Sequence, residues 1–486
     1  MPILGPDGKP YRSSSAYSEA APEVIQIVEQ AKLASEQGDP LLGLQQMISA
    51  YQSDVTSDIV VDATIELLQK SLDASGQETS DEIQLFQAIK DDRDNAVAYY
   101  QLGNRFFTLQ RPFLARPFLE KCRKMLEQAA ADNPQMQSGA EFLQISQAAD
   151  IDYAQTVMDI GDYEKTIELL HGINDKYGGL PLWLILEMAE CYALMGQLEE
   201  AGSVYSIITE EAVEQVQSQF PGIETAYEEV GDMIARIQDF DDPAQLNLRG
   251  WHYIQTRGIL LETNPQEDIP GERFVFFQPS EQDVAFITST AAAFLEAMDA
   301  APTKLLWLGE ESEPLARIFA HWWEIEDQDI RPYQIGDNTD NEEELSLLCI
   351  AHSYDIPDEE TYADLAEARS GLLTFALDLH WTERQPLTPD IAGFMSQTCN
   401  LPWETRLQVS EDQQTATPIE ETRDPVTIAD EIASQFPAEA DCDQTASELV
   451  QLYSSCKDLI LTHRDGSLSR RPLPLHSPVK SPRFGF

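Results

Sequence analysis

The chain has 486 residues, a hydrophobic fraction of 42% and a formal net charge of −54 at pH 7. This apolar content is that of a folded protein and excludes a disordered one, and the length favours two or three domains. The strong negative charge argues against non-specific binding to DNA or RNA, because the phosphates would be repelled.

The termini and the cysteines predict a cytoplasmic protein. No apolar run approaches the roughly 20 residues of a membrane helix, and residues 1–21, an expected extension, lack the apolar core of a secretory signal. Six cysteines occur without a C-x-x-C pair, which favours reduced thiols over disulfides or a zinc site. The acidity has two open explanations, an adaptation to a salty interior and a surface that recruits basic partners.

Residues 22–240 repeat a pattern of small residues that predicts paired helices. In MAECYALMGQLEEAGSVY, Ala189 and Ala201 let two helices approach, and Gly196 marks the end of the first one. The same spacings recur 35 residues earlier in YAQTVMDIGDYEKTIELL and again in YYQLGNRFFTLQRPFLARPFLEKC, with a looser copy in QAKLASEQGDPLLGLQQMISA. This recurrence favours stacked helical hairpins over a generic helical bundle.

The pattern resembles the tetratricopeptide repeat (TPR), a helix–turn–helix unit of 34 residues. The residues closest to that family's first-helix pattern, W-x2-L-G-x2-Y, are Tyr99, Leu102, Gly103 and Phe106. The sequence departs from the family at Thr166 and Gly43, where alanine is expected, and in one step of 51 residues between copies. Residues 211–240 are helical in period without the small-residue signature, and we interpret them as a capping helix pair.

The resemblance implies a TPR superhelix with a concave surface, lined by the first helix of each repeat, that holds a peptide or helix of a partner. The positions that carry over are Tyr100, Gln101, Asn104, Phe107, Thr108, Ile151, Asp152, Gln155, Asp159, Trp183, Glu187, Glu190 and Leu194. Because these side chains are aromatic, amide and acidic rather than basic, we expect the surface to prefer an apolar or basic segment over an acidic tail. An ordinary solvent-facing role is the alternative for each position.

The second half predicts a connector over 241–270 and an α/β domain of Rossmann-like type over 271–465. The apolar runs RFVFFQPS, TKLLWLG, LSLLCIAHS and LLTFALDLH predict strands, and a helical period follows each of the first three. Ser280 is placed to cap the first of these helices. The alternation predicts a parallel sheet with helices on its faces, and residues 410–425 are interpreted as a polar loop or linker.

Ligands of open parallel sheets bind beyond the carboxyl ends of the strands. The residues expected there are Ser280, Glu310, Glu311, Ser312, His352 and Asp355. The stretch LLWLGEESEPLARIFA faintly resembles the first motif of class I methyltransferases, but only Gly309 is present and carboxylates fill the turn. We therefore expect a degenerate or structural domain with no cofactor.

Metal binding is not expected either. His321, Glu324, His352 and His380 invite comparison with metal ligands, but their spacing along the chain matches no established metal site. Histidines that cap strands or pack beside tryptophans are the commoner case.

The basic, proline-rich tail over 466–486 is expected to be extended. It either docks on acidic surface of the same or a neighbouring molecule, or stays a mobile end. The sequence as a whole favours a protein-interaction adaptor or scaffold over an enzyme. The alternative is an enzyme whose α/β domain binds a nucleotide-like cofactor while the repeats recruit the substrate.

Overall fold

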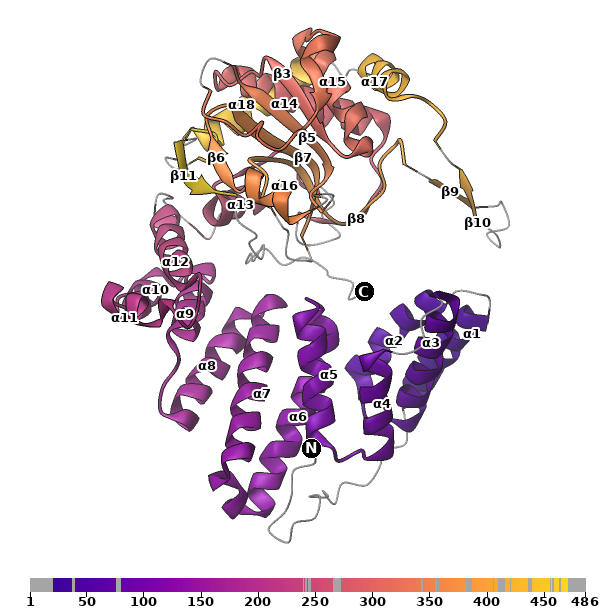
Figure 1. Cartoon of the computed structure of the whole chain (residues 1–486), viewed down its shortest axis with the longest axis vertical. Coiled ribbons are helices and arrows are strands. Elements are labelled where there is room, and N and C mark those ends of the chain that lie inside the picture. The colour runs from indigo at the N-terminus through magenta and orange to yellow at the C-terminus, as the bar shows by residue number, and fades with distance from the viewer. Residues whose placement is uncertain are drawn as a thin grey trace. The chain divides into compact units, whose positions relative to one another are not determined.

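The structure is a computed structural model. It describes residues 21–36, 40–75, 80–238, 240, 243, 246–264, 272–341, 344–354, 356, 358–381, 387–404, 406–409, 416–419, 421–435, 439–454, 456, 459–462 and 465–470. The chain divides into two compact units, and the main division falls after Val230. The first unit is helical and the second contains a parallel sheet (Figure 1), which confirms the predicted fold class, all-α followed by α/β.

The helices of the first unit follow one another in chain order, and each one from α1 to α9 packs against the next. They are α1 (Pro22–Glu36), α2 (Pro40–Asp54), α3 (Asp58–Ser75), α4 (Asp81–Asp91), α5 (Ala96–Thr108), α6 (Pro112–Asp132), α7 (Ala140–Asp159), α8 (Tyr163–Tyr177), α9 (Leu182–Leu194), α10 (Leu198–Tyr205) and α11 (Glu210–Gln217), and α12 (Ile223–Gln238) begins in this unit. Packing of neighbour on neighbour is the arrangement of a helical repeat protein.

One turn geometry occurs three times and marks the hairpins α5–α6, α7–α8 and α9–α10. Gln110, Gly161 and Gly196 have φ values of 58°, 88° and 72°. In each turn the N–H of this residue bonds to the carbonyl three residues earlier, and the next N–H bonds to the carbonyl five residues earlier. A left-handed residue with this bonding pattern closes a helix. The predicted helix end at Gly196 is therefore confirmed. The step of 51 residues between copies contains the long α6 and the 3-10 turn Pro134–Ser138 that follows it.

Small residues hold the paired helices close, as the pattern predicts. A Cβ atom added at Gly103 would lie 2.7 Å from the side chain of Leu119, and one at Gly43 would lie 2.6 Å from the carbonyl oxygen of Ala31. Thr166 is fully buried, and its hydroxyl donates to the carbonyl of Asp162 at 2.9 Å. A threonine can therefore replace the expected alanine, because its polar atom is satisfied inside its own helix.

A buried ion cluster joins three of these helices. The Asp150 carboxylate on α7 accepts from Arg123 of α6 at 2.6 Å and from Lys176 of α8 at 2.7 Å. The Tyr177 hydroxyl donates to the same carboxylate at 2.9 Å. Burial alone would raise the pKa of Asp150, but the hydrogen bonds to the two cations keep it below its ordinary value. Asp150 is thus a fully paired structural charge.

The sheet of the second unit has seven strands, all paired in parallel, in the order β1-β8-β7-β5-β3-β4, with β2 also beside β8. The strands are β1 (Ile259–Leu260), β2 (Phe274–Phe277), β3 (Lys304–Leu308), β4 (Ile330–Pro332), β5 (Ser346–His352), β7 (Leu372–His380) and β8 (Ile391–Cys399). The four predicted strands, β2, β3, β5 and β7, are confirmed. After β3 the chain adds β4 on one side and then β5 on the other, so the strand order reverses between β3 and β5.

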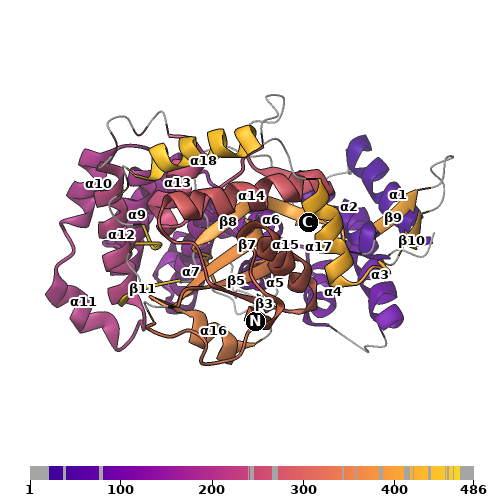
Figure 2. The same cartoon turned by 90° about the horizontal axis from the view of Figure 1, so that it is seen from above.

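Helices cover both faces of this sheet. The helices of the unit after α12 are α13 (Leu248–Thr256), α14 (Glu281–Ala297), α15 (Glu313–Trp323), α16 (Glu359–Leu365), α17 (Pro425–Ser434) and α18 (Glu439–Tyr453). On one face Phe319 of α15 meets Phe375 of β7 edge-on, and α17 and α18 pack outside α14 and α15 (Figure 2). On the other face Leu365 of α16 packs with Leu306 and Leu348.

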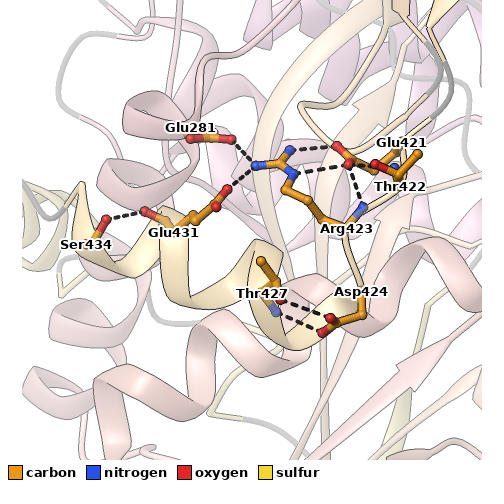
Figure 3. A network of polar contacts seen from close by, with 8 residues as sticks. All are labelled: Glu281, Glu421, Thr422, Arg423, Asp424, Thr427, Glu431 and Ser434. Atoms are coloured by element: carbon orange, nitrogen blue, oxygen red, sulfur yellow. Dashed lines mark hydrogen bonds and ion pairs between the residues drawn. The ribbon is translucent and has the colours of Figure 1, made fainter.

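Ser280 caps α14 as predicted, in a reciprocal capping box with Asp283. Close by, Arg423 bonds to Glu281 in the first turn of α14, to Glu421, and to Glu431 of α17 (Figure 3). Hydrogen bonding to Arg423 lowers the pKa of Glu421 to about 2. This guanidinium therefore ties the start of α17 to the start of α14.

The region interpreted as a polar loop, 410–425, is more ordered than predicted. β9 (Arg406–Val409) and β10 (Ala416–Ile419) form an antiparallel pair, and Asp424 caps α17 through Val426 and Thr427. Residues 410–415 and 420 lie outside the described residues. β10 lies inside the predicted loop and β9 lies just before it, so the segment contains a strand that its polar composition did not predict.

The last described segment forms a small antiparallel sheet at the amino edge of the parallel sheet. β11 (Asp465–Ser469) pairs antiparallel with β6 (Glu367–Arg369), so residues 466–469 of the predicted tail belong to a strand. The next residue, Arg470, is fully buried. Residues 471–486 of the predicted tail lie outside the described residues.

Arg470 satisfies its guanidinium inside the protein. Its Nε and Nη2 donate to the two oxygens of Asp390 at 2.8 and 2.9 Å, and the remaining bonds go to the carbonyls of Leu365, Glu367 and Leu372. Asp390 also accepts from the backbone N–H of Thr374 at 2.8 Å. A charge pair this deep is tolerated because both partners are fully hydrogen-bonded.

Candidate functional site

A cluster of ionisable side chains lies at the carboxyl edge of the sheet. His352 is the last residue of β5 and sits beside Asp378 of β7 in the parallel register. Its Nδ1 lies 3.0 Å from Asp378 Oδ2, and its Nε2 lies 2.7 Å from Oε1 of Glu404, in the loop after β8. The imidazole is therefore held at both nitrogens by carboxylates.

Asp378 is itself fixed by the next strand. Ser396 of β8 donates from its hydroxyl to Asp378 Oδ1 at 2.7 Å, and both side chains are fully buried. The two carboxylate oxygens of Asp378 are thus each committed, one to His352 and one to Ser396. Three adjacent strands together set the position of the imidazole ring.

Glu404 and Glu311 form the outer side of the cluster. The second oxygen of Glu404 accepts from the backbone N–H of Leu401 at 2.6 Å, which fixes the carboxylate in its loop. Glu311 comes from the turn after β3, and its carbonyl accepts from the indole of Trp403 at 2.9 Å. The ligand atoms of Glu311, His352 and Glu404 lie within 4.8 Å of one another.

The surrounding carboxylates determine the charge of His352. Both ring nitrogens face carboxylate oxygens, so both carry protons and the ring is an imidazolium. Burial alone would lower the pKa of His352, but the hydrogen bonds and charges of Asp378 and Glu404 raise it to about 10. The ring of the exposed Tyr354 stacks on the imidazole at 5.0 Å between centroids.

A second grouping shares part of this cluster. The Cys399 sulfur, at the end of β8, lies within 4.8 Å of the ligand atoms of His352 and Asp378. Burial and the charges of Asp378 and Glu404 raise the pKa of Cys399, so it is a thiol near neutral pH. The six cysteines of the chain are free thiols.

The predicted crevice residues have different outcomes. His352 and Glu311 meet in the cluster. Ser312 is buried, and its hydroxyl accepts from the N–H of Ala351 at 2.8 Å, so it ties the β3 turn to β5. Ser280 is the cap of α14, Glu310 is exposed, and Asp355 lies outside the described residues.

The other suggested metal ligands do not join the cluster. His321 pairs with Asp430 of α17 at 3.0 Å, and Glu324 adopts a left-handed conformation as the C-cap of α15. The N–H of His380 donates to the Ser353 hydroxyl at 3.1 Å.

The sequence missed Asp378, Ser396 and Glu404. Asp378 had one usable signal, since it is the single acidic residue in LLTFALDLH, an otherwise apolar strand. A carboxylate in a buried strand needs a partner. Ser396 and Glu404 carried no signal, because β8 itself was not predicted.

The predicted partner-binding positions of the first unit lie on α5, α7 and α9. Between these helices, Asn104 donates to Asp152 at 2.9 Å and Gln155 donates to Glu187 at 2.8 Å. Leu194 is the exception, because it is 1% exposed and belongs to the core. The remaining positions, all partly or fully exposed, are Tyr100, Gln101, Phe107, Thr108, Ile151, Asp159, Trp183 and Glu190.

No model of a known protein family matches the chain, and no curated protein matches it. In the part of the chain that the structure describes, every helix is too short or too polar to cross a membrane.

Proposed function

We propose that the first unit is a TPR-like protein-binding module that holds a basic segment of a partner protein. The observation that carries the proposal is the difference between Asp150 and Asp152. The two residues are two positions apart on α7 and so point to opposite sides of the helix. Asp150 is clamped by Arg123 and Lys176, whereas Asp152 bonds to the neutral groups of Asn104 and Tyr100.

Asp152 is suited to receive a cation from a partner. Burial raises the pKa of Asp152, and the hydrogen bonds from Asn104 and Tyr100 offset only part of this effect. The charged form of a buried carboxylate is stabilised when a lysine or arginine of a partner comes into contact with it. Asp159, Glu187 and Glu190 add further negative charge, and none of the twelve contact positions that remain without Leu194 is lysine or arginine.

Exposed apolar area beside these carboxylates supports the apolar part of the preference. Phe107, Ile151 and Trp183 are only partly buried. In this proposal the second unit is a Rossmann-like scaffold, the protein is cytoplasmic, and nucleic acid is not a partner because of the charge of the chain.

A peptide titration on the full chain tests the proposal. The probes are fluorescent peptides of equal length that alternate leucine with lysine, serine or glutamate, measured by anisotropy at physiological ionic strength. We expect the lysine–leucine peptide to bind about 10-fold tighter than the serine–leucine peptide, and the glutamate–leucine peptide not to bind.

Two variants distinguish binding at the proposed surface from non-specific attraction to the negatively charged chain. Asp152→Asn should lower the affinity for the lysine–leucine peptide by about 5-fold or more. Glu164→Gln removes one charge from an exposed position of α8, outside the contact positions, and should leave binding unchanged. Equal losses in the two variants would reduce the binding to non-specific attraction and overturn the proposal.

A further inference from the structure

We propose that His352, Glu404 and Glu311 form a binding site for a divalent transition-metal ion of the zinc type. The three residues come from β5, from the loop after β8 and from the turn after β3. They meet at the carboxyl edge of the sheet beside the point where the strand order reverses, which is where open α/β sheets bind their ligands. The proposal is independent of the one for the helical unit.

The spacing of the three ligand atoms fits one ion. They already lie within 4.8 Å of one another. Ligands at the usual 2.0–2.2 Å from a zinc ion are roughly 3–4 Å apart, so small side-chain rotations bring them onto a common centre. Binding exchanges the proton of His352 Nε2, which now bonds to Glu404, for the ion.

The residues behind the imidazole match the outer shell of a metal site. Ligating histidines donate their other ring N–H to a carboxylate, which fixes the ring and the free nitrogen. Here Asp378 takes the Nδ1 side at 3.0 Å and is itself held by Ser396 at 2.7 Å. Nε2 therefore points toward Glu404 and Glu311 with little freedom.

The charges of the outer residues also favour a cation. The carboxylate ligand oxygens of Glu311 and Glu404 lie within 4.8 Å of each other, and two ionised carboxylates at this separation repel. The positive partner of Glu404 in the described residues is the imidazolium of His352. A divalent ion placed between the two carboxylates replaces repulsion by attraction.

The donor set selects the class of ion. One imidazole nitrogen with two carboxylates suits zinc, manganese or iron(II), whereas magnesium and calcium prefer all-oxygen sites. Three protein ligands leave a coordination position for water, and exposed Glu311 places that position toward solvent.

The alternative grouping with Cys399 is less suitable. It combines Cys399 with His352 and Asp378, which are both buried, whereas the exposed Glu311 gives the proposed set a side that is open to solvent. The two groupings differ in one visible property, since only the alternative places sulfur on the metal.

Cobalt(II) titration of the full chain in excess magnesium tests the site. We expect saturable visible d–d absorption without a thiolate charge-transfer band, and displacement of cobalt by zinc. Glu404→Gln and Glu311→Gln should each weaken cobalt binding by at least about 10-fold, the loss that follows even from outer-shell changes.

The matched control is Glu310→Gln, which removes an exposed carboxylate next to Glu311 and should change the affinity less than 2-fold, roughly the scatter of such titrations. Near-ultraviolet circular dichroism checks that the variants fold. Because Glu311 is exposed, the substitution Glu311→Gln should leave the core undisturbed. Absence of saturable binding, equal losses in Glu310→Gln and Glu311→Gln, or a thiolate band would each overturn the assignment.

Discussion

The two edges of the parallel sheet hold buried charges of different kinds. At the amino edge Arg470 and Asp390 satisfy each other and the surrounding carbonyls, and both are fully buried. At the carboxyl edge one imidazolium faces Asp378 and Glu404, with Glu311 close by and exposed. The first arrangement is closed and structural, whereas the second has an excess of carboxylates and an open side.

The helical unit repeats this contrast on a single helix. Asp150 is paired with two cations inside the unit, whereas Asp152 on the other side of α7 bonds, among the described residues, to the neutral groups of Asn104 and Tyr100. A buried carboxylate with protein cations stabilises the fold. We propose that one without such cations receives the cation of a partner.

The largest predicted effect comes from breaking the closed pair. Arg470→Met leaves Asp390 buried without its cation and should lower the free energy of unfolding of the second unit by about 3–5 kcal/mol. Urea denaturation of the full chain measures it. Adding Asp390→Asn should restore part of the loss, because the stranded charge is removed.

The control for Arg470 is Arg331→Met, which breaks a more exposed bidentate pair with Asp337. It should cost less than about 1 kcal/mol. If both substitutions lower the free energy of unfolding equally, the buried Arg470–Asp390 pair stabilises the second unit no more than an exposed pair does.

The next effect concerns Asp150 and its pH dependence. Asp150→Asn removes the two charged hydrogen bonds and should destabilise the first unit by roughly 2 kcal/mol at neutral pH. Because the pKa of Asp150 is lowered by folding, its contribution is complete above the ordinary carboxyl value of 3.8 and is lost as the pH falls through the folded-state pKa.

Denaturation at a series of pH values measures this difference. The gap between wild type and Asp150→Asn should narrow as the pH falls below that value. A gap that stays constant or widens in acid would contradict the assigned pairing.

The smallest change in the free energy of unfolding is predicted for Asp152. Asp152→Asn should change the free energy of unfolding by less than about 0.5 kcal/mol, because a half-buried charge without a cation contributes little to stability. Parallel denaturation curves of Asp150→Asn and Asp152→Asn provide the comparison. Equal destabilisation would remove the distinction between structural and available carboxylates.

Periodicity and turn chemistry predicted most of the fold. β2, β3, β5 and β7 are continuous apolar runs, and Gly196 ends its helix as glycine does in a left-handed cap. β8 was missed because IAGFMSQTC mixes glycine and polar residues, although the strand is largely buried. Its polar groups are paired by neighbours far along the chain, such as Ser396 with Asp378, and no local pattern reports that pairing.

The candidate site was only partly predictable for the same reason. His352 and Glu311 follow strands, so the rule for carboxyl ends reaches them. Glu404 depends on β8 and its loop, and the metal spacing is set by three separate segments rather than by one motif. The sequence therefore led to the expectation of no metal site.

Anomalous diffraction from crystals of the full chain grown with zinc locates the ion directly. We expect an anomalous peak at the zinc edge within about 2.0–2.2 Å of His352 Nε2 and the carboxylates of Glu404 and Glu311. A peak on the Cys399 sulfur, or no peak at the carboxyl edge in zinc-loaded crystals, would contradict it.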